Sequence, residues 1–224
     1  MVKRSVYDLR FDVLDPRAFF PKNVSVCEDS FGLWRDQWSQ TFVELGLESE
    51  LPSNDFLDRQ VSGLFEGDRP VGLLLYGWYD LRRGSHLKHA YFKGFPQMVL
   101  DEVRAQDHSH VMTISYLTLA AGWRRHVTDV PLSDVLIACS VKMFQQSHAS
   151  ALLGYYRNDR KVNEMVYRHG GRPILADAVA YGVKVDYAVI TKDEAHESTV
   201  TGVRDAAATL WNRWQTPQDV RISA

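Results

Sequence analysis

The chain has 224 residues, of which 45% are hydrophobic and 12% aromatic, and its 26 basic and 28 acidic side chains leave a net charge of −2. This length and composition support one domain with a substantial core and exclude a disordered chain. The near-neutral charge gives no general attraction to nucleic acid, and apolar runs such as Val71 to Tyr76 are too short to span a bilayer. We therefore expect no nucleic-acid partner and no membrane span.

The two cysteines, Cys27 and Cys139, form neither a disulfide framework nor a metal-binding spacing. No apolar signal core follows the basic N-terminus. We therefore expect a soluble, cytoplasmic protein without a metal. Cys139 falls on the apolar face of a predicted helix, where a buried and unreactive thiol is expected.

The first predicted elements in chain order are one helix and two strands. The helix runs from Asp29 to Gly46 and carries a stripe of large aromatic side chains. The strands, Val61 to Phe65 and Val71 to Tyr79, are joined by a hairpin turn. Since the second strand is almost entirely apolar, we expect it to be covered on both faces. A short helix from Phe95 to Arg104 follows.

The middle of the chain, from Met112 to Ile174, carries the most information about function. It predicts strand Met112 to Leu119, a basic loop, helix Pro131 to Ser147, strand Ala151 to Tyr156 and a further helix that contains Tyr167. A strand that opens into a basic turn at a helix N-terminus can hold an anion, because free N–H groups and the helix dipole favour negative charge there.

The last third of the chain predicts two paired strands and a helix. Residues Ala176 to Ala180 and the alternating run Tyr181 to Thr191 form the strands. The helix, about residues 193–215, includes Trp211 and Trp214, and these large apolar side chains are compatible with a homodimer interface. With neither repeat nor linker in the sequence, we predict one domain over residues 1–224 with a core of about 25–191.

This order of elements resembles the GNAT superfamily of acyltransferases, most firmly over about Val61 to Ile190. The resemblance implies an α/β (α+β) fold: a mixed, mostly antiparallel sheet with splayed central strands, flanked by helices, with an extra C-terminal helix here. It also implies acetyl-CoA or another acyl-CoA as co-substrate. The acceptor would be a small-molecule or peptide amine that attacks the thioester directly, as in N-acetyltransferases.

The resemblance also implies a set of donor-binding residues. In the family the pantetheine arm pairs with the fourth strand, and the pyrophosphate binds the turn after it. The matching positions here are Leu117, Leu119, Arg124, Arg125, His126, Val127 and Thr128. Arg124 fits the first position of the family's Q/R-x-x-G-x-G/A turn, but Val127 and Asp129 replace its small residues. An aspartate facing the pyrophosphate would repel it.

Three further positions follow from the resemblance. Asn158 or Asn163, after the fifth strand, would contact the pantetheine arm. Tyr167, shortly before Gly170, matches the family's tyrosine that protonates the departing thiolate, a role that suits a phenol. No carboxylate lies in strand 112–119, so the sequence assigns no general base.

Two other interpretations stay open. The glycine-poor turn favours an acyl carrier protein as the donor, as in N-acyl amino acid synthases and acyl-homoserine lactone synthases, with the aromatic helix and segment Tyr91 to Pro96 lining an acyl tunnel. Alternatively, the turn has decayed and the chain is a non-catalytic binding module. The acceptor itself cannot be read from the sequence.

Overall fold

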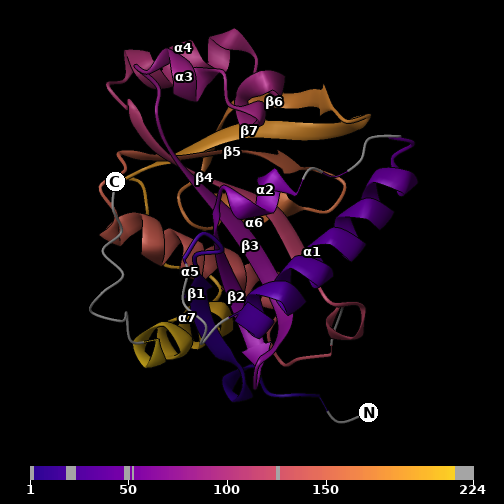
Figure 1. Cartoon of the computed structure of the whole chain (residues 1–224). Coiled ribbons are helices and arrows are strands. Elements are labelled where there is room, and N and C mark those ends of the chain that lie inside the picture. Colours follow the sequence, from indigo (N-terminus) through magenta and orange to yellow (C-terminus); the bar gives the residue numbers. More distant parts are fainter. Residues whose placement is uncertain (1–2, 19–23, 48–50, 52, 125–126, 215–224) are drawn as a thin grey trace. The chain divides into compact units, whose positions relative to one another are not determined.

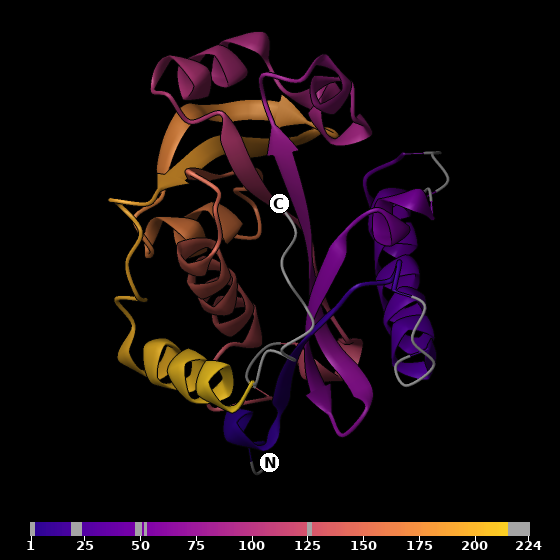
Figure 2. The same cartoon turned by 60° about the vertical axis from the view of Figure 1, so that its left-hand side comes forward.

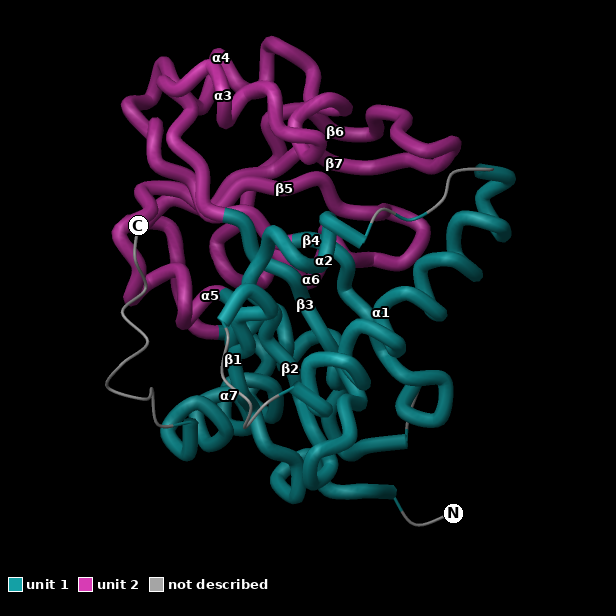
Figure 3. The backbone as a smooth tube through the Cα atoms, in the orientation of Figure 1, with its two compact units in different colours: residues 1–77, 115–140, 198–223 teal, residues 78–114, 141–197, 224 magenta. Residues whose placement is uncertain are grey.

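The computed structural model describes the chain apart from residues 1–2, 19–23, 48–50, 52, 125–126 and 215–224. Hydrogen bonding orders its seven strands as β1-β2-β3-β4-β5-β7-β6 (Figure 1). This mixed sheet is mostly antiparallel, which confirms the predicted fold class. The chain divides into two compact units (Figure 3): unit 1 holds residues 1–77, 115–140 and 198–223, and unit 2 holds residues 78–114 and 141–197.

Unit 1 contains the N-terminal strands and most of the long helices. Its elements are η1 (Val6–Asp8), β1 (Arg10–Leu14), α1 (Val24–Glu44), α2 (Asn54–Leu57), β2 (Gln60–Glu66), most of β3 (Arg69–Asp80), the second half of β4 (His110–Leu119), η4 (Ala121–Trp123), the first part of α5 (Leu132–Gln146) and α7 (Thr201–Arg213).

Both faces of β3 are buried in unit 1, as its apolar sequence predicts. Leu73 and Leu75 pack in one core cluster with Trp34 of α1. On the other face, Gly72 is so close to Leu136 of α5 that a Cβ at this glycine would lie 3.0 Å from the leucine side chain. The hydroxyl of Tyr76 lies 3.0 Å from the Ser140 hydroxyl of the same helix. β3 is therefore a central strand.

The C-terminal helix α7 packs on the N-terminal part of unit 1, and Figure 2 shows it beside η1 and β1. Its buried residues Val203 and Leu210 belong to the same core cluster as Phe11 of β1. The rings of Trp211 and Trp214 lie 5.7 Å and 5.6 Å from the ring of Phe11, centre to centre. These tryptophans thus fill an internal contact, and they no longer favour a homodimer.

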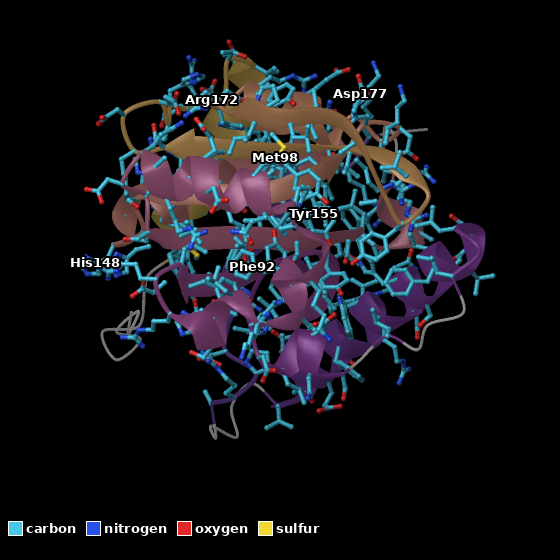
Figure 4. All side chains as sticks on the ribbon, turned by 90° about the horizontal axis from the view of Figure 1, so that it is seen from above. Phe92, Met98, His148, Tyr155, Arg172 and Asp177 are labelled. Carbon is cyan, nitrogen blue, oxygen red and sulfur yellow. The ribbon has the colours of Figure 1, made fainter. Side chains whose placement is uncertain are left out.

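Unit 2 combines the remaining strands with short helices. Its elements are α3 (Gly84–Leu87), η3 (Ala90–Gly94), α4 (Gln97–Ala105), the first half of β4, the end of α5, β5 (Ala151–Arg157), α6 (Val162–Tyr167), β6 (Arg172–Ala180) and β7 (Val183–Thr191). Its core is a cluster of buried side chains from η3, α4 and the strands, among them Phe92. Tyr155 is half-buried and packs against this cluster; both residues are labelled in Figure 4.

The parallel pairing between β4 and β5 is short. It joins residues 111–113 to residues 151–153, although β4 continues to Leu119 and β5 to Arg157. The buried Tyr91 lies where this pairing ends, with its hydroxyl oxygen 3.5 Å from the carbonyl oxygens of both Ile114 and Leu153. The aromatic side chain therefore occupies the position at which the two strands stop pairing.

Several predicted boundaries are wrong. α1 already extends back to Val24, so Asp29 is inside the helix. β6 begins at Arg172, whereas the sequence predicts a strand only from Ala176. The sequence does not predict β1, because alternation of polar and apolar residues in Arg10–Leu14 lasts for only four residues, as far as Val13. No helix in the described residues is both long and apolar enough to cross a membrane.

The predicted start of the C-terminal helix, about residue 193, is also wrong, because α7 begins at Thr201. Residues 193–200 are not helical, because the Glu194 carboxylate accepts bonds from Thr191 and from the Arg172 guanidinium. The backbone of this segment lies directly on Gly170, where a Cβ would meet the Glu194 carbonyl oxygen at 2.0 Å. Gly170 has a φ of 92°, so both the space and the backbone conformation require glycine.

The same segment buries His169. Its side chain is 2% exposed, and Nδ1 lies 3.2 Å from the carbonyl oxygen of His196. Burial lowers the pKa of His169 to about 4, although the His196 carbonyl opposes this, and the nearby charges of His196, Arg168 and Lys142 lower it further. The imidazole is therefore neutral in the folded protein at pH values where an exposed histidine is protonated.

His169 should make unfolding depend on pH. Between about pH 6.5 and pH 4 the unfolded chain binds a proton that the folded chain does not, so stability falls as the pH falls, by about 3 kcal/mol at pH 4. Urea unfolding at pH 7, 5.5 and 4.5 measures this. His169→Gln should flatten the dependence, whereas His148→Gln, at an exposed position (Figure 4), should keep it. Equal pH dependence in wild type and His169→Gln would contradict the assignment.

Candidate functional site

The turn after β4 in unit 1 is held by Arg124, the first residue of the predicted anion-binding motif. Its side chain is exposed. The Nε atom donates to the carbonyl oxygen of Leu119 at 3.3 Å, and Nη2 donates to the side chain of Gln37 in α1. Arg124 is thus fixed at the carboxyl end of β4 with its charge accessible to solvent.

The rest of this turn binds the N-terminal segment of the chain. The amide of Arg4 donates to Val127 at 2.8 Å, and the amide of Asp129 donates to the carbonyl of Arg4 at 3.3 Å. Thr128 forms an isolated parallel bridge with Arg4. The Asp129 amide is therefore already in use, and the predicted roles of Val127 and Thr128 stay predictions. Arg125 and His126 lie outside the described residues.

The Asp129 carboxylate is held by two backbone amides. Its carboxylate oxygen Oδ1 accepts the amides of Val6 and Val130, each at 3.1 Å. The side chain therefore joins the N-terminal segment to the residues just before α5. At the position where the family turn has a small residue, the aspartate thus contributes hydrogen bonds within unit 1.

Leu117 and Leu119 lie in the second half of β4 and are half-buried against the core cluster of α5 and α7. Because their side chains pack in part against this cluster, a binding role for these residues would involve their backbone rather than their side chains. Their predicted pairing with a pantetheine arm stays a prediction.

In unit 2, the three predicted residues Asn158, Asn163 and Tyr167 converge on one carboxylate, that of Asp186 in β7. Asn158 Nδ2 donates to Oδ1 at 2.9 Å and Asn163 Nδ2 donates to Oδ2 at 2.8 Å. The Tyr167 hydroxyl donates to Oδ2 at 2.5 Å. The backbone amide of Asp177, labelled in Figure 4, completes the set at 2.8 Å.

This network fixes the charge of Asp186, whose side chain is 5% exposed. Burial opposes ionisation, but the bonds from Tyr167, the Asp177 amide, Asn158 and Asn163 outweigh it and lower the pKa of Asp186 to about 2. The pKa of Tyr167 is raised, first by burial and then by its bond to the Asp186 carboxylate. At neutral pH the pair is therefore a carboxylate and a neutral phenol.

The geometry limits what Tyr167 can do. Its proton points at Asp186, so it can reach another acceptor only if that hydrogen bond opens. A raised pKa keeps the phenol protonated but makes it a weaker acid. The amide oxygens of Asn158 and Asn163 have no partner in the described structure. The arrangement is a rigid set of donors built around one negative charge.

Sequence reasoning missed Asp186. It occupies a polar position in the alternating run of residues 181–191, and the alternation by itself gives no sign that this position is buried. Instead, β7 is buried on both faces from Val185 to Ile190. The available signal was the cluster of amide and phenol donors at positions 158, 163 and 167, which together require a buried acceptor.

The segment that we predicted to line an acyl tunnel, Tyr91 to Pro96, contributes its aromatic side chains to the core of unit 2. Tyr91, Phe92 and Phe95 are buried and pack on each other within the core of unit 2. Cys139 is fully buried, as expected, and Cys27 is half-buried. Within the described residues, no group of three or more histidine, cysteine, aspartate or glutamate side chains is arranged to hold a metal.

Comparison with known proteins gives the fold. No family model matches the sequence, and no curated protein does. The CoA-dependent acyl-homoserine lactone synthase BjaI, solved with SAM and isopentyl-CoA, is 15% identical with a TM-score of 0.60 over 92% of this chain and 89% of BjaI. FeeM, an N-acyl amino acid synthase from uncultured soil microbes, is 11% identical with a TM-score of 0.52 over 83% of this chain and 92% of FeeM.

An agmatine N-acetyltransferase mutant in its apo form is also similar, at 12% identity and a TM-score of 0.53 over 81% of this chain and 99% of that one. These three proteins are acyltransferases of one fold class. The chain therefore has the GNAT fold, and the resemblance proposed from the sequence is confirmed at the level of the fold.

Loss of the Asp186 carboxylate should destabilise unit 2. Asp186→Ala leaves three side-chain donors and one amide without their acceptor, which should lower the free energy of unfolding by about 3 kcal/mol at pH 7. Urea unfolding measures this. Asp159→Ala, which removes a surface pair with Arg157, is the matched control and should cost less than about 1 kcal/mol. Equal effects of the two substitutions would rule out the proposed importance of the network.

Proposed function

We propose that the protein is an acyltransferase that moves an acyl group from a pantetheine thioester, in the first place acetyl-CoA or another acyl-CoA, to an amine. The observation that carries this proposal is the GNAT fold with a β4–β5 pairing of three residue pairs. The paired register between β4 and β5 ends at residue 113, and the edge of a strand beyond such a point can bind an extended amide-bearing arm by main-chain hydrogen bonds.

For unit 1 we assign Arg124 to the phosphate of the donor. Its guanidinium is exposed and held by Leu119 and Gln37, so little side-chain freedom is lost when an anion binds. The turn lies before the N-terminus of α5, whose dipole also favours an anion. Arg125, His126, Val127 and Thr128 are assigned to the same anion on the strength of the family resemblance.

For unit 2 we assign Asn158 and Asn163 to the pantetheine arm and Tyr167 to the departing thiolate. The amine would attack the thioester carbonyl, the carbon–sulfur bond would break as the phenol proton passes to sulfur, and the proton released by the attacking nitrogen would restore the phenol. The proton must first leave its bond with Asp186. No acyl-enzyme is formed, so no nucleophilic side chain is needed.

A second candidate is an acyltransferase whose donor is an acyl carrier protein. BjaI, which covers 92% of this chain, is itself CoA-dependent, so this candidate depends on the turn after β4 and not on that similarity. The Asp129 amide is bonded to Arg4, which removes one donor that a pyrophosphate would use. A carrier-bound arm has a single phosphate and needs fewer such donors.

Arg124→Ala should weaken donor binding. We expect acetyl-CoA, a long-chain acyl-CoA or CoA to raise the melting temperature of the wild type, because only the folded protein binds the ligand. A lost charge-assisted contact should increase Kd about tenfold. Arg35→Ala, at an exposed arginine of α1 paired with Asp36, is the control and should bind as the wild type does.

The outcomes of this titration separate the candidates. A saturable shift that is weakened in Arg124→Ala and unchanged in Arg35→Ala supports a CoA donor. No shift with any of the three ligands contradicts it and favours a carrier-protein donor or a non-catalytic module. A shift that Arg124→Ala does not alter would remove Arg124 from the donor site.

Tyr167→Phe should lower turnover and leave donor affinity nearly unchanged. The substitution keeps the ring and removes the proton, and loss of a general acid slows the reaction about 100-fold. Steady-state kinetics give kcat, and calorimetry gives Kd for the donor. A variant that melts at a lower temperature but keeps its kcat would show that Tyr167 only supports Asp186.

A further inference from the structure

Tyr116 has an unusual backbone conformation inside β4. Its φ is 59°, in the left-handed region that bulky residues rarely adopt. The neighbouring residues belong to one continuous strand, His110–Leu119. Such a conformation persists only where several surrounding contacts impose it. The contacts around Tyr116 in unit 1 therefore matter.

The backbone carbonyl of Tyr116 is held by a relay of two side chains. The Thr118 hydroxyl donates to this carbonyl at 2.6 Å. The indole Nε1 of Trp38 in turn donates to the Thr118 hydroxyl oxygen at 3.0 Å. Since Thr118 is 2% exposed, its hydroxyl cannot exchange these partners for solvent. The relay fixes the orientation of the peptide that follows Tyr116.

The side chain of Tyr116 is held independently. Its hydroxyl donates to the carboxylate of Asp55, which also pairs with Arg59 at 3.3 Å. The Arg59 guanidinium lies 5.2 Å from the centre of the Tyr116 ring and donates to the Ser115 hydroxyl at 2.8 Å. Arg59 is 2% exposed, so Asp55 is also needed to balance a buried charge.

Two tryptophans of α1 complete the enclosure. Trp34 and Trp38 contact the Tyr116 ring edge to face, at 5.5 Å and 4.9 Å between ring centres. Three segments of the chain therefore converge on Tyr116: α1, residues 55–59 in and after α2, and the neighbouring part of β4. Yet Tyr116 itself is half-buried and the next residue, Leu117, is too. The strained backbone conformation of Tyr116 therefore lies in a part of β4 that solvent partly reaches.

We propose that these contacts form a lock, here called the Tyr116 lock (Asp55, Arg59, Trp38 and Thr118 around Tyr116), that positions the acyl donor. The lock keeps a left-handed turn in β4 and so sets the direction of the backbone from Leu117 to Leu119. This inference rests on the proposed donor role of that backbone. The members of the lock are positioning residues, since the donor contacts the backbone that they orient.

The test compares two substitutions that remove the same side chain. Glycine adopts a positive φ readily, whereas alanine does not. Tyr116→Gly should therefore keep the turn, and Tyr116→Ala should relax toward an extended strand and lose part of its binding-competent population. The donor Kd of Tyr116→Ala should be about five- to thirtyfold higher than that of Tyr116→Gly. Calorimetry with the acyl-CoA that shifts the wild type measures this.

A second pair keeps the tyrosine. Thr118→Val removes the hydroxyl with little change of shape, and Thr118→Ser restores it. Thr118→Val should raise the donor Kd about fivefold, and Thr118→Ser should bind as the wild type does. Melting temperatures of all four variants, without ligand, show which changes belong to folding alone.

The results discriminate between a positioning role and a structural one. The lock is supported if Tyr116→Gly binds the donor more tightly than Tyr116→Ala, and Thr118→Ser binds it more tightly than Thr118→Val. Melting temperatures that follow this order while all four Kd values agree would overturn it. A wild type that binds no acyl-CoA would overturn the proposed function, and the positioning role with it, whatever the variants do.

Discussion

The short parallel pairing between β4 and β5 is the constraint on which the rest depends. Parallel neighbours need a crossover connection, and here α5 supplies it. A turn must therefore stand between the carboxyl end of β4 and the N-terminus of α5, and it is this turn, with Arg124, that we propose binds an anion. Because the pairing ends after three residues, the last part of β4 keeps backbone groups that β5 does not use.

The sequence predicts the elements whose pattern is decided locally. β3, β4, β5 and α5 were found almost to their ends, since continuous apolar runs and a helical stripe of buried residues suffice to define them. The long apolar face of α5 and the two-sided burial of β3 follow from the same signal. The order of these elements was enough to identify the fold, which the solved structures confirm.

The missing parts depend on contacts between distant residues. The burial of Asp186 was missed, because alternation along β7 says nothing of the donors that α6 and the irregular part of β6 at Asp177 place beside it. The sequence alone shows only that Asp129 would repel a phosphate, because one of its partners, the amide of Val6, lies 123 residues away along the chain. Tyr116 gave no signal at all, since a positive φ in a strand is imposed by tertiary contacts.

The Asp186 network also shapes the edge strand of unit 2. β6 is the terminal strand in the order of the sheet, a position that normally offers free N–H and C=O groups to a neighbouring molecule. Its pairing with β7 is irregular on both sides of Leu175, Pro173 has no N–H to offer, and Asp177 turns its amide inward to Asp186. The buried carboxylate that orders α6 thus also blunts this edge against strand-by-strand aggregation.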